Sequence, residues 1–362
     1  MVVYAVVQGD TREVRQGEQL DGPALAAYLR WHLTDEQIPG LRLDREMQIA
    51  QFPGGHSNLT YLIRFGGAEL VLRRPPLGPV APRAHDMARE YRWLSALHPV
   101  FARAPRPCLL CMDTSVIGSV FYVMERRRGL VVRSDEPMPL AHPERRQRLS
   151  ESMVDTLLEL HDVDVTSGPI AELGKPIGFL DRQVSGWTER WERSRLEPLP
   201  AMDAVAMWLA AHQPPDTLEP TVVHGDFKLD NVLIDPLDPS RIVAVLDWEM
   251  AALGDPLVDL GIMLAYWTLV EGPGQPDALS TVTGLPGYLS RNELVARYAD
   301  RSGRDISNIA FYEVFAVFKI AAVIQQIYYR YRRGQTVDER FATLGDRVLA
   351  LARRARRLAN EG

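Results

Sequence analysis

A short polar stretch lies between apolar, β-branched runs in the second half of the chain. Residues 221–231 read TVVHGDFKLDN, and the run IVAVLDWE follows after the turn-forming segment DPLDPS. The apolar runs predict short strands, whereas the segments before and after them have apolar residues at the helical spacing of about 3.6. The chain must therefore fold so that a small β-structure, carrying His, Asp, Lys and Asn in its turns, interrupts a largely helical region.

The 362 residues predict two lobes, because one hydrophobic core seldom grows beyond roughly 250 to 300 residues. We expect the first lobe to cover residues 1–125, with an early helix, a five-stranded sheet and one helix against the sheet. Its predicted strands are EMQIAQF, NLTYLIRF, AELVLRR, CLLCM and SVFYVMER, with a tight GGA hairpin between the second and third. Residues 126–362 are predicted to be mainly helical, so the fold class is α+β.

Composition and charge exclude several classes of protein. With 41 basic and 47 acidic residues the net charge is -6, so nucleic acid is not an expected partner. The N-terminal MVVYAVVQGD lacks the basic region of a signal peptide, and its apolar run is too short. The longest apolar segment, 309–329, carries Glu313, Lys319, Gln325 and Gln326, which a lipid-facing helix would resist. We expect a cytoplasmic protein without membrane association, and the sequence does not indicate an oligomeric state.

Cys108 and Cys111 are too few for a disulfide scaffold and are typical of a reducing compartment. Their CxxC spacing fits a redox pair or half of a zinc site. Because no second CxxC or clustered His pair completes a set of ligands, the favoured interpretation is two free thiols in a core strand. The arginine-rich final helix, RVLALARRARRLA, is interpreted as a solvated helix face rather than a binding patch.

The polar stretch has the composition of a phosphoryl-transfer site. His224, Asp226 and Asn231 fit the pattern HxDxxxxN, and Asp247 follows at the end of the next apolar strand. In such a site an Asp orients the acceptor hydroxyl and takes its proton, while an Asn oxygen and a second carboxylate hold Mg²⁺. The alternative is an Asx-rich turn capped by the His, which does not account for Asp247 at a strand end.

HGDFKLDN resembles the catalytic loop of the aminoglycoside phosphotransferase superfamily, and LDWEMAALGDPLVDLG resembles its metal-binding segment and the helix that follows. The resemblance implies a protein-kinase-like bilobal fold, with a small β-rich N-lobe and a large helical C-lobe, that phosphorylates small molecules with ATP and Mg²⁺. It also implies Asp226 as catalytic base, Asn231 and Asp247 as Mg²⁺ ligands, His224 as a support of the loop, and Lys228 as a contact of the transferred phosphate.

Four residues around the metal segment have implied roles of their own. Asp255 is expected to cap the helix that it precedes, and Asp259 to anchor the catalytic loop. DWE stands where protein kinases have DFG, so Trp248 replaces a mobile Phe. This change predicts no activation-loop flip, and Glu249 is a candidate for the metal shell or the substrate site.

The resemblance places the nucleotide in the N-lobe. PGGHSNLTY resembles the phosphate-covering loop, with Gly54, Gly55 and Ser57 as candidate contacts, although two glycines are fewer than a full GxGxxG and also fit a plain hairpin turn. Arg73 stands where kinases have a Lys on the third strand, and Glu90 is its expected partner. Arg keeps the charge and the ability to bind phosphate or carboxylate, whereas the alternative is an ordinary surface ion pair.

FYVMER, the last strand of the N-lobe, resembles the adenine hinge. The backbone of Glu125 and Arg126 would face the base, with Met124 beside it. A buried edge strand would have the same sequence, so this assignment depends on the resemblance, and it does not distinguish ATP from GTP.

AELVLRRPP, IGFLDRQVSGWTERWERS and FKIAAVIQQIYYRYRRGQ are similar to segments of the kinase-like domain of acyl-CoA dehydrogenase family members ten and eleven and of its free-standing bacterial relatives. No dehydrogenase portion is present, so we expect the stand-alone type. The candidate acceptor-binding residues, besides Glu249, are Arg182, Trp187, Trp191, Trp267, Tyr328 and Arg330. Aromatic residues on helices are more often core residues than ligands.

The arginines of these helices favour a phosphorylated or CoA-linked acceptor over a polycationic aminoglycoside. The resemblance to domains of acyl-CoA dehydrogenases then implies a hydroxyacyl compound or its CoA thioester. Two alternatives stay open. An aminoglycoside-resistance enzyme would share the catalytic residues, and a nucleotide-binding pseudokinase that acts as an interaction module would fit Arg73 and the sparse glycine loop, although the catalytic set is complete.

Overall fold

The computed structural model describes residues 10–34, 38–53, 58–77, 85–133, 135–267, 279, 282–336 and 338–361. The chain divides into two compact units, Met1–Arg128 and Gly129–Gly362. The first unit ends at Arg128, whereas the sequence predicts that the first lobe ends at residue 125.

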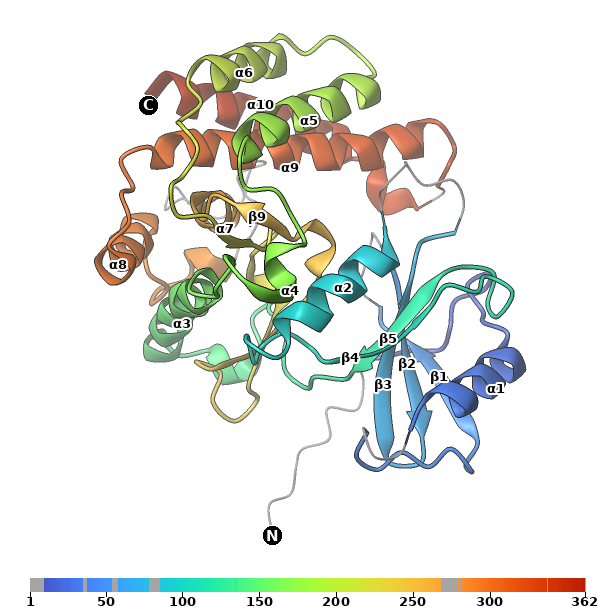
Figure 1. The fold of residues 1–362 in the computed structure, drawn as a ribbon. Helices are drawn as coiled ribbons and strands as arrows, with labels where there is room; N and C mark the ends of the chain where they lie inside the picture. The colour runs from blue at the N-terminus through green and yellow to red at the C-terminus, as the bar shows by residue number, and fades with distance from the viewer. Residues whose placement is uncertain are drawn as a thin grey trace. The chain divides into compact units, whose positions relative to one another are not determined.

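The first unit is built on an antiparallel sheet with the strand order β1-β2-β3-β5-β4 (Figure 1). The strands are Met47–Gln51 (β1), Leu59–Phe65 (β2), Ala68–Arg74 (β3), Pro107–Cys111 (β4) and Phe121–Glu125 (β5). The hairpin between β2 and β3 turns at Gly66, whose φ of +62° favours glycine, and a Cβ there would lie 2.7 Å from the Cβ of Arg42. These are the strands and the hairpin that the sequence predicts.

Two helices pack on this sheet. In Gly22–His32 (α1), Leu25 and Leu29 are buried in one apolar cluster with residues of β2, β3, β4 and β5. Met87–Leu97 (α2) contacts β4 and β5 and begins at Asp86, whose carboxylate accepts a hydrogen bond from the backbone N–H of Arg89. These contacts pack the two helices against the sheet that carries Arg73 on β3 and Glu125 on β5.

The second unit is mainly helical. Its longer helices are Pro143–His161 (α3), Phe179–Ser194 (α5), Pro200–Ala211 (α6), Leu257–Tyr266 (α7), Arg291–Ser302 (α8), Ile309–Arg332 (α9) and Leu344–Glu361 (α10), and a single turn at Gly168–Ala171 (α4) was not predicted. The central helix is α9, which contacts α5, α6, α7 and α10 (Figure 1). By length and composition α9 could cross a membrane, but 67% of its most apolar window is buried inside the structure. It is therefore a core helix, as predicted.

Two small antiparallel sheets carry the polar stretch. Thr221–Val223 (β6) pairs with Ala252–Gly254 (β9), and Val232–Ile234 (β7) pairs with Ile242–Val245 (β8). The first three of these strands in sequence order, β6, β7 and β8, were predicted, whereas β9 was not. This pairing brings the β6–β7 loop and the segment after β8 to the same part of the unit.

Cys108 and Cys111 are free thiols on β4. Burial raises the pKa of Cys108 to about 11, so its thiol stays protonated and unreactive near neutral pH. The prediction of two free thiols is confirmed, but β4 is the edge strand of the sheet and only Cys111 is buried, so the predicted core strand is wrong. Among the residues that the structure describes, no group of three or more His, Cys, Asp or Glu side chains could hold a metal ion.

Candidate active site

The loop between β6 and β7 brings Asp226 and Asn231 into direct contact. The side-chain amide of Asn231 donates hydrogen bonds to the backbone carbonyl of Asp226 at 2.8 Å and to its carboxylate Oδ2 at 2.9 Å. Asn231 closes a 3₁₀ turn, Leu229–Asn231, that leads into β7. Because its Nδ2 group is directed at Asp226, its Oδ1 is the atom that could ligate a cation.

The start of the loop is anchored by Asp259 of α7. Its Oδ2 accepts from the backbone N–H of His224 at 2.6 Å and its Oδ1 from that of Gly225 at 2.7 Å. Burial alone would raise the pKa of Asp259, but its interaction with His161 and the hydrogen bond from the backbone N–H of His224 hold that pKa below its usual value. Asp259 is therefore an ionised, buried anchor, which confirms the role that the sequence predicts for it.

His224 links the loop to the end of β8. Its Nδ1 accepts from the backbone N–H of Asp226 at 3.2 Å, and its Nε2 lies 2.9 Å from the carbonyl oxygen of Leu246. With Nδ1 as acceptor, Nε2 must carry the proton, so these two contacts define a neutral imidazole. The fully buried ring thus holds Asp226 and the residue before Asp247 at a fixed separation.

Asp247 follows β8 in an unusual backbone conformation. Its φ is 69°, in the left-handed region that non-glycine residues seldom adopt and that is concentrated at functional sites. The backbone N–H of Leu246 donates to the carbonyl of Asn231 at 2.8 Å, which ties the two candidate metal ligands to adjacent backbone segments.

Trp248 is 1% exposed and its indole N–H donates to the carbonyl of Val245 at 2.9 Å, so its ring is fixed within the core. Glu249 lies in the same 3₁₀ turn, Trp248–Met250.

Asp255 lies at the start of α7. Its carboxylate accepts from the backbone N–H of Leu257 at 2.9 Å and from the hydroxyl of Tyr312 at 2.7 Å. The predicted capping contact is present, although Pro256 is the residue directly before the helix.

Lys228 is held against the candidate base. Its Nζ lies 2.8 Å from Oδ2 of Asp226 and 3.4 Å from the hydroxyl of Tyr266, and 4.6 Å from the centre of the Tyr266 ring. Burial opposes the charged amine, but Tyr266 and Asp226 outweigh it and raise the pKa of Lys228. The Lys228 ammonium therefore stays charged beside Asp226, where it could also attract phosphate oxygens.

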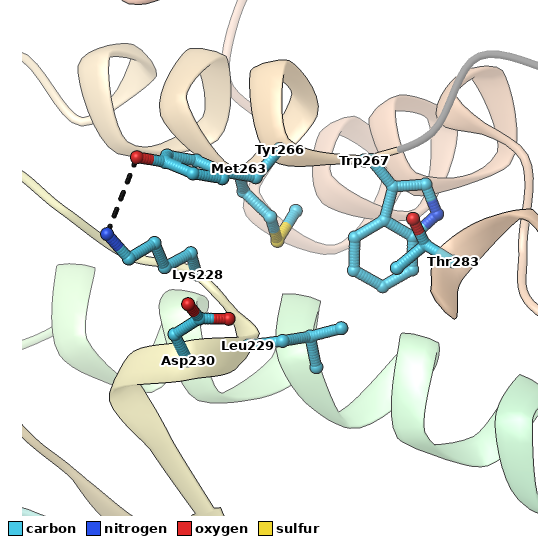
Figure 2. A pocket seen from close by; sticks show the side chains of 7 residues that line it. All are labelled: Lys228, Leu229, Asp230, Met263, Tyr266, Trp267 and Thr283. Atoms are coloured by element: carbon cyan, nitrogen blue, oxygen red, sulfur yellow. Dashed lines mark hydrogen bonds between the residues drawn. The ribbon is translucent and has the colours of Figure 1, made fainter. Parts of the chain in front are cut away.

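A small pocket adjoins this lysine. Its cavity volume is about 10 Å³, room for about one water molecule, within about 270 Å³ of space that includes open solvent. Its lining residues are Lys228, Leu229, Asp230, Met263, Tyr266, Trp267 and Thr283. Figure 2 shows Lys228 and Tyr266 at one end, joined by their hydrogen bond, and Trp267 and Thr283 at the other. The Trp267 ring is fixed, because its indole N–H donates to the carbonyl of Leu289 at 2.8 Å. The pocket thus has a polar end next to Asp226, and Leu229, Met263 and Trp267 form an apolar wall beyond it.

The predicted acceptor-binding residues are not gathered at this pocket, apart from Trp267. Trp187 and Trp191 of α5 are 5% and 1% exposed and belong to the core. The guanidinium of Arg182 donates to the backbone carbonyls of Ile177 and Lys175, in the loop before α5.

Tyr328 and Arg330 lie near the C-terminal end of α9. The Tyr328 hydroxyl accepts from the guanidinium of Arg332 at 2.8 Å. Their part in acceptor binding stays a prediction. Asp230, Met263, Tyr266 and Thr283 also line the pocket, but the sequence predicts no role for them, because local patterns cannot bring these positions together.

In the first unit, Arg73 and Glu90 form a buried pair. Nη1 of Arg73 lies 2.5 Å from Oε1 of Glu90, and the two side chains are 9% and 1% exposed. The predicted partnership is confirmed, and the alternative of an exposed surface pair is wrong. Gly54, Gly55 and Ser57 lie outside the described residues.

The candidate hinge residues are held by local contacts. The Glu125 carboxylate accepts from the backbone N–H of Arg106 at 2.8 Å, and Met124 is 8% exposed. The Arg126 guanidinium pairs with Asp10 at 2.7 Å and with Glu69 at 2.5 Å. The side chain of Arg126 is thus engaged within its own unit, which leaves its backbone for any contact with a nucleotide base.

The chain is similar to known phosphotransferases and to part of certain acyl-CoA dehydrogenase family members. Residues 48–294 match the model of the phosphotransferase enzyme family. Curated relatives include acyl-CoA dehydrogenase family member 11 of Rattus norvegicus, 35% identical over 92% of this chain and 42% of that protein. Family member 10 of Mus musculus is 35% identical over 90% of this chain and 30% of that protein. The chain thus spans less than half the length of these relatives.

Solved structures show the same fold. A putative aminoglycoside phosphotransferase from Ralstonia eutropha is 30% identical, with a TM-score of 0.77 over 95% of this chain and 99% of that one. The aminoglycoside phosphotransferase APH(4)-Ia, in a ternary complex with AMP-PNP and hygromycin B, is 15% identical, with a TM-score of 0.54 over 86% of this chain and 94% of that one. The chain therefore belongs to the phosphotransferase enzyme family and has the protein-kinase-like fold of the aminoglycoside phosphotransferases.

Proposed function

We propose that this protein transfers the γ-phosphoryl group of ATP, with Mg²⁺, to a hydroxyl group of a small molecule bound in the pocket beside Lys228. The observation that carries the proposal is the contact of the Asn231 amide with both the carbonyl and the carboxylate of Asp226, at 2.8 and 2.9 Å. A candidate base and a candidate metal ligand are thereby held one hydrogen bond apart, which would place the acceptor hydroxyl close to metal-bound phosphates.

Each residue of the loop has a distinct task in this proposal. Asp226 accepts the proton of the acceptor hydroxyl, and Lys228 interacts with the oxygens of the transferred phosphate. Oδ1 of Asn231 and the carboxylate of Asp247 are oxygen donors, the ligand type that Mg²⁺ prefers. Bound Mg²⁺ would neutralise phosphate charge.

The nucleotide is assigned to the first unit. Arg73 is oriented by its contact with Glu90, which fits a guanidinium that binds α- and β-phosphates, and the Glu125 and Arg126 backbone would face the base. Among the structural neighbours, APH(4)-Ia has been solved with AMP-PNP and aminoglycoside 2'-phosphotransferase-IIIa with GDP. We propose ATP as the phosphate donor, and the test below compares ATP with GTP.

The acceptor is proposed to be a hydroxyacyl compound or its CoA thioester. Leu229, Met263 and Trp267 give the pocket an apolar wall that suits an aliphatic chain, and Asp230 is its one carboxylate among the described lining residues. A polycationic aminoglycoside would favour several carboxylates. The curated relatives are named as members of the acyl-CoA dehydrogenase family, which supports an acyl compound as the acceptor.

The test compares acceptors side by side with Mg-ATP and with Mg-GTP. Short- and medium-chain hydroxyacyl-CoAs, the matching free hydroxy acids and hygromycin B are each incubated with the protein. Nucleoside diphosphate release is measured together with the mass of the product, and the Asp226→Asn variant serves as the blank. We expect a phosphorylated hydroxyacyl product. Turnover with hygromycin B alone would overturn the acceptor class, and nucleotide binding without transfer to any acceptor would favour a pseudokinase module.

A further inference from the structure

Lys319 is a buried charge in an otherwise apolar stretch of α9. The residue is 5% exposed, and its helical neighbours from Val314 to Ala322 are buried and apolar. An ammonium group in such a place is costly unless it is well satisfied. The packing of α9 alone gives no reason for a lysine at this position.

The Lys319 side chain reaches the catalytic loop. Its Nζ donates to the backbone carbonyl of Gly225 at 2.5 Å and lies 5.2 Å from the centre of the Trp187 ring on α5. The acceptor of this hydrogen bond belongs to the peptide unit that joins Gly225 to Asp226. Lys319 therefore contacts the peptide bond directly before the candidate base.

Gly225 makes this contact important. Its φ is +82°, and a Cβ there would lie 2.8 Å from the carbonyl oxygen of Met250, so glycine is required. Glycine places few restraints on the orientation of the peptide that follows it. Asp259 fixes the N–H of Gly225, in the peptide before it, and Lys319 fixes its C=O, in the peptide that leads to Asp226. The two side chains therefore restrain the peptides on both sides of Gly225, and Lys319 restrains the one from which Asp226 projects.

We propose that Lys319 is a positioning residue of the phosphoryl-transfer site, which orients the Asp226 carboxylate by holding the carbonyl of Gly225. The inference rests on the proposed role of Asp226 as base. It also makes the packing of α5, α7 and α9 a determinant of catalytic geometry, because Trp187, Asp259 and Lys319 come from these three helices. Burial lowers the pKa of Lys319 to about 8, and the amine can donate this hydrogen bond in either protonation state.

The test replaces Lys319 with Met, which keeps the length of the side chain and removes the donor. Met removes the desolvation cost of the buried amine, which offsets the loss of the hydrogen bond to Gly225, so Lys319→Met should fold. The matched control is Gln325→Met. Gln325 is also 5% exposed on α9, and its amide donates to the carbonyl of Ser194 at 2.8 Å, in α5 and outside the catalytic loop.

Two measurements on the full chain decide the question. Amide hydrogen exchange in residues 224–228 should become about tenfold faster in Lys319→Met and stay unchanged in Gln325→Met. The kcat for transfer from Mg-ATP, to the acceptor found in the panel or to water, should fall on the order of 100-fold in Lys319→Met, with the KM for ATP within about twofold of wild type.

Unchanged loop exchange in Lys319→Met would overturn the inference, and so would faster exchange with an unchanged kcat. An equal loss of kcat in Gln325→Met would show that the effect is general to α9 and would also overturn it. If the wild-type protein transfers no phosphate, the proposed function fails instead, and the exchange comparison alone decides whether Lys319 orders the loop.

Discussion

Replacing Asp259 with Asn is expected to destabilise the helical unit by about 3 kcal/mol and to lower kcat. The buried carboxylate accepts two backbone N–H groups, from His224 at 2.6 Å and from Gly225 at 2.7 Å. Asn offers one oxygen acceptor, so one of these donors would face an NH₂ group and lose its partner. An unpaired buried group costs about 1–3 kcal/mol, and the remaining hydrogen bond loses the strength that the charge supplies, about 1 kcal/mol.

The assay is urea unfolding followed by circular dichroism, together with kcat for phosphate transfer. With an m-value of about 3 kcal/mol/M, the expected loss shifts the midpoint by about 1 M. Because the folded pKa of Asp259 lies below its ordinary value of 3.8, its contribution is present above pH 3.8 and is lost as pH falls through the folded pKa. The difference between wild type and variant should therefore stay constant from pH 7 to about pH 5.

The matched control is Asp255→Asn. Asp255 accepts from the backbone N–H of Leu257 and from the hydroxyl of Tyr312. A hydroxyl can accept as well as donate, so an Asn amide fits this site, and the loss should be below about 1.5 kcal/mol with kcat nearly unchanged. Equal losses of stability and kcat in the two variants, or a loss below about 1 kcal/mol for Asp259→Asn, would refute the anchoring argument.

Three further predictions concern other contacts. Arg73→Met should cost the first unit about 3–5 kcal/mol in urea unfolding, because the buried Glu90 carboxylate loses its contact with the Arg73 guanidinium, and adding Glu90→Met should recover most of the loss. Because burial lowers the pKa of Lys319 from 10.5 to about 8, wild type should gain stability relative to Lys319→Met as pH rises from 8 to 10.5, and a flat difference would contradict this. Gly225→Ala should lower stability by about 2 kcal/mol or more in thermal unfolding, since its φ is +82° and its Cβ would meet Met250; a neutral substitution would count against the tight turn.

The parts of the site that could be predicted are those that a short stretch of sequence encodes. HxDxxxxN brings Asp226 and Asn231 together because one tight loop joins them, and the resemblance of LDWEMAALGDPLVDLG supplied the role of Asp259. The Arg73–Glu90 pair followed from the same resemblance. In each case the family pattern names the partner as well as the residue.

The parts that could not be predicted depend on packing between distant segments. The pocket joins Asp230 of the loop, Tyr266 of α7 and Thr283 of the 3₁₀ turn Val282–Gly284, and no periodic pattern connects these positions. Strand β9 is short and is defined by its pairing with β6. Lys319 stood out in the sequence only as a charge within an apolar helix, which argued against a lipid-facing span and gave no indication of its contact with Gly225.

The central claim is that Asp226 is the base of a phosphoryl-transfer reaction, and the most direct test is phosphate transfer from γ-labelled ATP into an extract of small metabolites. The Asp226→Asn variant should lower transfer on the order of 10³-fold, while its Kd for Mg-ATP stays within about twofold of wild type. Asp235→Asn is the control, because Asp235 pairs with Arg241 just beyond β7 and should leave transfer unchanged. Transfer at the wild-type rate by Asp226→Asn would contradict the account.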